Sequence, residues 1–172
     1  YKDLGFHKPI MLAGGIGSIK EVQIKKGVPK AGDAVIVLGG PAMLIGLGGG
    51  SASSTKKTND NADLDFASVQ RSNPEMQRRA QQVLDKFNEK SSKNPITFIH
   101  DVGAGGISNA IPELAKDTNL GVEINLENID SADQTMSPME LWCNESQERY
   151  VFTIPMKKLR ALEDICRKER CP

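Results

Sequence analysis

The sequence has little of several residue types that define whole classes of protein. Its 22 Lys and Arg residues balance 22 Asp and Glu residues, so no net charge attracts nucleic acid or an acidic membrane surface. Only two histidines are present, His7 and His100, which leaves little for a zinc site or a Ser-His-Asp triad. No apolar run approaches the roughly 20 residues of a transmembrane helix. We therefore expect no nucleic-acid partner, no membrane partner and no signal peptide.

The cysteines form no pattern that indicates disulfides or a metal site. There are three, Cys143, Cys166 and Cys171, with no Cys-x-x-Cys pair. We expect free thiols in a reducing, cytoplasmic location, and buried small side chains rather than nucleophiles. The contents of 38% hydrophobic and 26% charged residues are typical of a globular domain. With 172 residues and Tyr1 at the start, we expect one domain that is part of a longer protein.

Short apolar runs alternate with helical patterns along the chain. The predicted strands, each bounded by turn-forming residues, cover residues 10–13, 34–38, 96–99, 122–126 and 150–154. Capping residues and apolar spacing predict helices from Asn73, after Gly106, from Ser137 and from Pro155. The polar stretch 51–61 is predicted to be a surface loop. This order predicts an α/β fold of the layered α+β kind, with a mixed sheet and helices packed on it.

Glycine is the residue that this sequence concentrates. Six of its 16 glycines lie between residues 39 and 50. Backbone N–H groups of such a loop can converge on an anion, so Gly48, Gly49, Gly50 and Ser51 are candidates for a phosphate loop. A flexible connector is the alternative. Neither the P-loop pattern nor the dinucleotide-binding pattern Gly-x-Gly-x-x-Gly is matched, so a P-loop ATPase and a Rossmann dehydrogenase are not supported.

Polar residues at two predicted strand ends are candidates for chemistry. Asp101 follows one strand and precedes a second glycine turn, a position where ligands collect in α/β sheets. A role as turn former or helix cap is the alternative. The run Asn-Glu-Ser-Gln-Glu-Arg at 144–149 precedes the last predicted strand. It is either a solvated loop or a binding loop, in which Glu145 accepts hydrogen bonds and Gln147 both donates and accepts.

Four segments, taken together, resemble one enzyme family. They are Gly-Gly-Pro-Ala-Met-Leu-Ile-Gly-Leu-Gly-Gly-Gly-Ser-Ala-Ser-Ser, Asp-Phe-Ala-Ser-Val-Gln-Arg-Ser-Asn-Pro-Glu-Met, His-Asp-Val-Gly-Ala-Gly-Gly and Leu-Trp-Cys-Asn-Glu-Ser-Gln-Glu-Arg-Tyr. In this order they are similar to phosphoribosylformylglycinamidine synthase in its large, single-chain form. That family converts formylglycinamide ribonucleotide, ATP and glutamine into formylglycinamidine ribonucleotide, ADP, phosphate and glutamate in purine biosynthesis.

The resemblance implies roles for five residues of this chain. Gln70 and the loop residues Glu145, Ser146 and Gln147 would contact formylglycinamide ribonucleotide, and Asp101 would bind Mg²⁺. The cofactors implied are Mg²⁺ and ATP, the latter as a substrate. If Gln70, Asp101 and Glu145 serve one substrate, we expect them at the same end of the sheet, on one open concave face.

The resemblance also implies a larger protein. Residues 1–30 would be an N-terminal strand and linker, and residues 31–172 an aminoimidazole ribonucleotide synthetase C-terminal-type domain. The whole enzyme would be an ATP-dependent carbon–nitrogen ligase with glutamine as amido donor. The family's ATP-binding and glutaminase domains, which would be further partners in the same chain, match nothing here, so we expect the isolated chain to be inactive. Two alternatives remain, a phosphate- or nucleotide-binding domain of another superfamily member and a non-catalytic scaffold domain.

Overall fold

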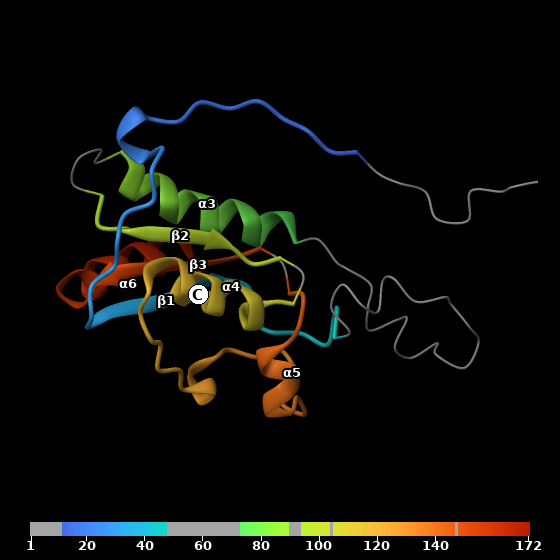
Figure 1. Ribbon diagram of the computed structural model, residues 1–172. Helices are drawn as coiled ribbons and strands as arrows, with labels where there is room; N and C mark the ends of the chain where they lie inside the picture. Colours follow the sequence, from blue (N-terminus) through green and yellow to red (C-terminus); the bar gives the residue numbers. More distant parts are fainter. Residues whose placement is uncertain (1–11, 48–72, 90–93, 104, 147) are drawn as a thin grey trace, which may run out of the picture.

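The computed structural model describes residues 12–47, 73–89, 94–103, 105–146 and 148–172 (Figure 1). Its strands are β1 (Asp33–Gly39), β2 (Phe98–Asp101) and β3 (Arg149–Pro155). Its α-helices are α3 (Pro74–Asn88), α4 (Ile107–Thr118), α5 (Pro138–Trp142) and α6 (Leu159–Glu169). Short 3₁₀ turns are η1 (Glu21–Gln23), η4 (Leu126–Asn128) and η5 (Met156–Lys158). No described helix is long and apolar enough to cross a membrane.

The three strands form one sheet in the order β1-β3-β2. Both pairings are antiparallel, and an isolated bridge between Ala42 and Ser131 is parallel. Because β3 runs against both neighbours, the C-terminal ends of β1 and β2 lie beside the start of β3. The layered α/β fold expected from the sequence is confirmed, while the sheet of the described strands is antiparallel rather than mixed.

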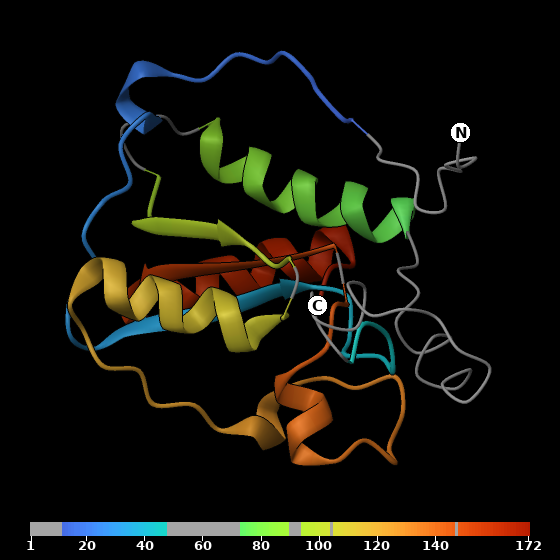
Figure 2. The ribbon, with the colours of Figure 1, turned by 45° about the vertical axis from the view of Figure 1, so that its right-hand side comes forward.

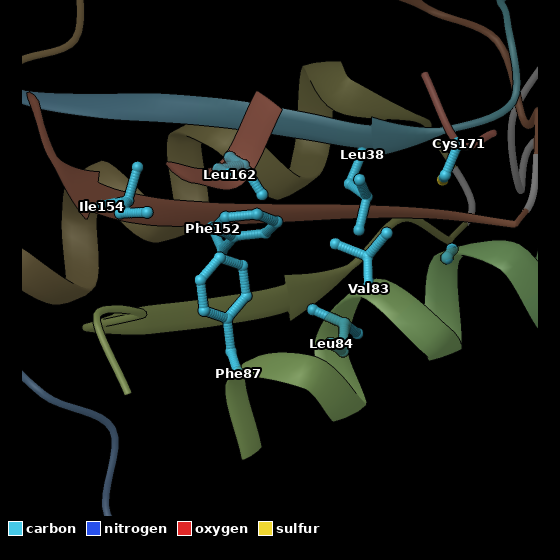
Figure 3. Close-up of a cluster of buried hydrophobic side chains, with 9 residues drawn as sticks. Leu38, Val83, Leu84, Phe87, Phe152, Ile154, Leu162 and Cys171 are labelled. Atoms are coloured by element: carbon cyan, nitrogen blue, oxygen red, sulfur yellow. The ribbon is translucent and has the colours of Figure 1, made fainter. Parts of the chain in front are cut away.

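Alternating side chains of the sheet build a core on each face. On one face Phe152 and Ile154 pack against α3 and α6, with Phe87 and Leu162 at the centre of the contact (Figure 3). On the other face Val151 packs against α4 (Figure 2). Helices therefore cover both faces of the three-stranded sheet and bury its apolar side chains.

Two helices, α3 and α5, begin where capping residues predict. The side chain of Asn73 accepts a hydrogen bond from the N–H of Met76, and Pro74 occupies the first position of α3. Ser137 and Glu140 form a reciprocal capping box at the start of α5. Pro155 does not open α6, because η5 intervenes and the α-helix begins four residues later.

Three of the predicted strands differ from the structure. The strand predicted at 122–126 is wrong: this segment is irregular and its Ile124 is exposed. The strand predicted at 96–99 lies instead at 98–101, because pairing with β3 rather than apolarity alone fixes its ends. The strand predicted at 10–13 falls partly outside the described residues, and Leu12 within them is irregular and 92% exposed. The surface loop predicted at 51–61 also lies outside them.

Candidate functional site

Three loops of the described chain meet at one end of the sheet. Residues 40–47 follow β1, residues 102–103 follow Asp101 at the end of β2, and residues 143–146 come shortly before β3. The pairings of Gly39 with Arg149 and of Asp101 with Tyr150 bring these loops together. The sequence analysis expected Gln70, Asp101 and Glu145 at one sheet end. The register of the strands brings Asp101 and Glu145 to the same end, while Gln70 lies outside the described residues.

Backbone hydrogen bonds tie these segments together. The N–H of Glu145 donates to the carbonyl oxygen of Ile45 at 2.9 Å. The N–H of Val102 donates to the carbonyl oxygen of Arg149, the first residue of β3, at 3.1 Å. The 143–146 loop is therefore bonded to the 40–47 loop, and the start of β3 to the segment that follows β2.

Two glycines allow the loops to approach so closely. A Cβ at Gly46 would overlap the side chain of Glu145, and a Cβ at Gly106 would overlap the carbonyl oxygen of Asn144. Both glycines also have positive φ, +60° and +65°, which side chains disfavour. Each of the two glycine-rich stretches thus supplies one glycine on which the 143–146 loop packs.

A buried polar network shapes the 143–146 loop from inside. The Arg149 guanidinium donates from Nε to the carbonyl oxygen of Ser146 at 2.7 Å and from Nη2 to Oδ1 of Asn144 at 2.9 Å. The Ser146 hydroxyl donates to the same Oδ1 at 2.6 Å. The Asn144 amide donates in turn to the carbonyl oxygens of Glu140 and Leu141 in α5. Each of these hydrogen bonds joins residues no more than 5 apart in the sequence, so the loop is shaped largely by its own polar groups.

The side chains of this loop are less accessible than the sequence led us to expect. Glu145 is only 6% exposed, so its predicted place on an open face is wrong for the chain as it stands. Ser146 is fully buried, and its hydroxyl also accepts from the N–H of Met43 at 2.9 Å. The close packing against Gly46 explains the burial of Glu145. Substrate contacts by these two residues stay a prediction.

Asp101, unlike Glu145 and Ser146, is largely exposed to solvent. Its side chain is 81% exposed at the end of β2. The neighbouring His100 turns toward α4, where its Nε2 lies 2.7 Å from a carboxylate oxygen of Glu113. Within the described part of the chain no group of three or more His, Cys, Asp or Glu side chains is placed to hold a metal ion. Any ion at Asp101 would need ligands from elsewhere.

The other predicted site residues lie outside the described residues. These are Gln70, Gln147 and the phosphate-loop candidates Gly48, Gly49, Gly50 and Ser51. The described residue closest in sequence to Gln70 is Asn73, whose N–H donates to a carboxylate oxygen of Glu148 at 3.0 Å. The start of α3 therefore lies at the same sheet end as the three loops.

Two cavities border the described residues. One, of about 280 Å³, opens beside β1 on the α4 face and extends from Val37 and Ile111 to Gly39, Gly40 and Arg149 at this sheet end. The other, of about 810 Å³, lies between the N-terminal segment and the α3–β2 layer. Neither of these two cavities is lined by Asp101, Glu145 or Ser146.

The cysteine thiols are poor candidates for nucleophiles. All three cysteines are free. Burial raises the pKa of Cys166 and of Cys171 to about 11 in each case. The thiolate form of these two residues is therefore scarce at neutral pH.

A family model for the AIR synthase related protein, C-terminal domain, matches residues 30–172. The chain belongs to this family. The match covers both glycine-rich stretches and the 143–146 loop, so the convergence described above lies within the family's domain.

Solved structures from Thermotoga maritima share this AIR synthase C-terminal-type fold. PurL complexed with FGAR superposes with a TM-score of 0.72 at 24% identity, over 88% of this chain and 24% of that chain. PurL complexed with ATP gives 0.66 at 21% identity, over 88% and 22%. Phosphoribosylformylglycinamidine synthase II gives 0.63 at 22% identity, over 87% and 22%. The chain therefore spans about a quarter of the length of the solved proteins that it matches.

Sequence reasoning missed two members of the site. Asn144 and Arg149 were placed in a polar run without separate roles, although they are 0% and 2% exposed. A signal was present for Arg149, because it opens a strand whose other members are almost all apolar. A charged residue in that position must be solvated or satisfied internally.

Proposed function

We propose that this chain is the substrate- and Mg²⁺-binding domain of a PurL-type phosphoribosylformylglycinamidine synthase. The complete enzyme would be an ATP-dependent carbon–nitrogen ligase of purine biosynthesis that takes its amido nitrogen from glutamine. The observation that carries the proposal is the meeting of the two glycine stretches and the Glu145 loop at one end of the sheet. The superposition with a PurL that holds FGAR supports the choice of substrate.

Two helix N-termini make this sheet end suitable for a phosphorylated substrate. Both α3 and α4 begin there, and α4 has no side-chain cap, since its N-cap is Gly106. Helix N-termini carry positive partial charge and stabilise anions. The phosphate-loop candidates Gly48 to Ser51 would add backbone N–H groups beside them.

Asp101 is suited to Mg²⁺ held jointly by protein and nucleotide. Mg²⁺ commonly binds one or two carboxylates, substrate phosphates and water rather than a cage of protein ligands. A single carboxylate that is 81% exposed fits this arrangement. When bound, the ion would neutralise phosphate charge during phosphoryl transfer to the amide oxygen. Asp101 would hold the ion, while Gln70 and the 145–147 loop would orient the amide.

The remaining parts of the site would come from other domains of the same polypeptide. In this arrangement residues 31–172 form the domain and residues 1–30 lead into it from the preceding one, a division that the family match over 30–172 supports. A neighbouring domain would close the exposed side of Asp101. The isolated chain would then show neither synthetase nor glutaminase activity, and the complete enzyme would work in the cytoplasm.

The proposal is tested by replacing Asp101 in the full-length polypeptide. Asp101→Asn keeps the shape of the side chain but weakens a hard oxygen ligand. We expect ligase turnover to fall at least roughly tenfold, equivalent to about 1.4 kcal/mol of barrier. Excess Mg²⁺ should restore part of the loss.

A matched control is Asp117→Asn, in the last turn of α4 at the other end of that helix. It should keep native turnover and native Mg²⁺ dependence. Normal ligation by Asp101→Asn at low Mg²⁺ would reduce Asp101 to a turn former and overturn its metal role.

A further inference from the structure

We propose that Arg149 is a positioning residue for the substrate loop: its buried guanidinium fixes the backbone at Asn144 and Ser146 and so sets where Glu145 lies. The inference rests on the proposed function for the identity of the substrate. It assigns a role to a residue that makes no contact with that substrate. It explains why a charged group is buried at the start of a core strand.

The burial of the Arg149 guanidinium costs free energy, and its contacts must account for that cost. The residue is 2% exposed, and burial lowers its pKa to about 10, so it stays protonated at neutral pH. Within the described part of the chain no carboxylate forms an ion pair with it. A buried, unpaired cation is expensive, and a hydrophobic residue of similar volume commonly serves stability as well or better. Stability alone therefore does not account for arginine here.

The contacts of Arg149 are specific to one loop. Nε donates to the carbonyl oxygen of Ser146 at 2.7 Å, and Nη2 lies 2.9 Å from Oδ1 and 3.3 Å from the backbone oxygen of Asn144. These acceptors flank Glu145 on both sides. The planar guanidinium holds them at a fixed separation, which a flexible ammonium cannot do.

By fixing Asn144 and Ser146, Arg149 also sets the position of Glu145. With Asn144 and Ser146 fixed, the N–H of Glu145 meets the carbonyl oxygen of Ile45, and its side chain rests on Gly46. The carbonyl oxygen of Arg149 itself accepts from Val102, next to Asp101. One residue thus connects the loop of Glu145 with the strand end of Asp101.

The third guanidinium nitrogen of Arg149, Nη1, is buried and makes no hydrogen bond to the residues that the structure describes. The guanidinium therefore holds the loop with two of its three nitrogens. Its position is set by the loop contacts rather than by satisfaction of every donor.

The test uses Arg149→Lys and Arg149→Met in the full-length polypeptide, with Arg167→Met as control. Arg167 lies in α6 with its side chain 75% exposed. Two quantities are measured: hydrogen exchange of the peptide spanning 143–149 against that spanning 150–155, and the steady-state constants for formylglycinamide ribonucleotide and ATP. The first needs no substrate and the second reports on substrate binding.

We expect Arg149→Met to speed exchange in 143–149 at least tenfold while 150–155 stays protected. The KM for formylglycinamide ribonucleotide should rise at least tenfold, with kcat and the KM for ATP within threefold of native. Arg149→Lys should be intermediate, and it decides the question if the Met variant does not fold. Arg167→Met should match the native protein in every measurement.

The possible failures are distinguishable. Native exchange in 143–149, or native KM, in both Arg149 variants would overturn the positioning role. Faster exchange spread equally over 150–155 would also overturn it, because the residue would then support the fold as a whole. A third outcome would overturn the proposed function alone. In it, the Arg149 variants exchange faster at 143–149, but the native polypeptide itself does not use formylglycinamide ribonucleotide.

Discussion

Replacement of Gly106 by alanine should loosen the site more than any comparable change in the same turn. Gly106 has φ +65° and ψ −147°, a backbone conformation almost restricted to glycine. A Cβ there would overlap the carbonyl oxygen of Asn144 and lie 3.0 Å from its carbonyl carbon. Both neighbours are backbone atoms of the 143–146 loop, so the loop itself must move.

The cost of Gly106→Ala has two parts. Holding alanine in this conformation costs about 1–3 kcal/mol. Overpacking against the loop adds about 1–3 kcal/mol. The free energy of unfolding should therefore fall by about 2–6 kcal/mol, and even the lower figure lowers the Tm by at least roughly 4 °C for a chain of this size.

Urea unfolding measures this prediction directly. Trp142 is the only tryptophan of the chain and lies half-buried at the end of α5, directly before the 143–146 loop, so its fluorescence follows the same region. The control is Gly103→Ala, because a Cβ at Gly103 meets nothing within 4 Å and φ there is not positive. Gly103→Ala should change the free energy of unfolding by no more than about 0.5 kcal/mol. Equal stabilities for the two variants would refute the close approach of Gly106 to Asn144.

Two further predictions concern titratable groups. The N–H and hydroxyl of Ser137 hold the pKa of Glu140 below its usual range, so this capping box contributes stability above the unfolded pKa and loses it as pH falls through the folded value. Glu140→Gln should thus destabilise the chain at pH 7. The difference in free energy of unfolding between the native protein and this variant, measured in urea, should be smaller at pH 3. An equal difference at both pH values would contradict the assignment. Because burial raises the pKa of Cys166 and Cys171 to about 11, both thiols should react slowly with iodoacetamide at pH 7.5 and faster as pH rises. Rapid, pH-independent alkylation of either would show that the thiol is not shielded as described.

Local signals in the sequence predicted much of the fold. The caps at Asn73 and Ser137 locate two helices, because Asn, Ser and a following Pro satisfy first-turn requirements on their own. The apolar run at 34–38 marks β1 because its side chains alternate between the two cores, although only Leu38 among them is fully buried. The segment 122–126 alternates like a strand, yet none of the described segments pairs with it, and pairing is a property of the fold rather than of the segment.

The sequence predicted where in the fold Asp101 and Glu145 lie, but not how the side chain of Glu145 packs. The positions of Asp101 and Glu145 after and before strands were enough to predict that they share a sheet end. The burial of Glu145 depends on Gly46 and on Arg149, which lie 99 residues before it and 4 after it. The contact between Gly46 and Glu145 is set by tertiary structure, and no spacing along the chain predicts it.

The binding of formylglycinamide ribonucleotide at this sheet end is tested most directly by titration calorimetry on the full-length polypeptide. Native protein and Glu145→Gln are compared, with Glu163→Gln in α6 as control. The native protein and the control should bind with equal affinity, and Glu145→Gln at least roughly tenfold more weakly, about 1.4 kcal/mol. Native affinity in Glu145→Gln would contradict a substrate site built on this loop.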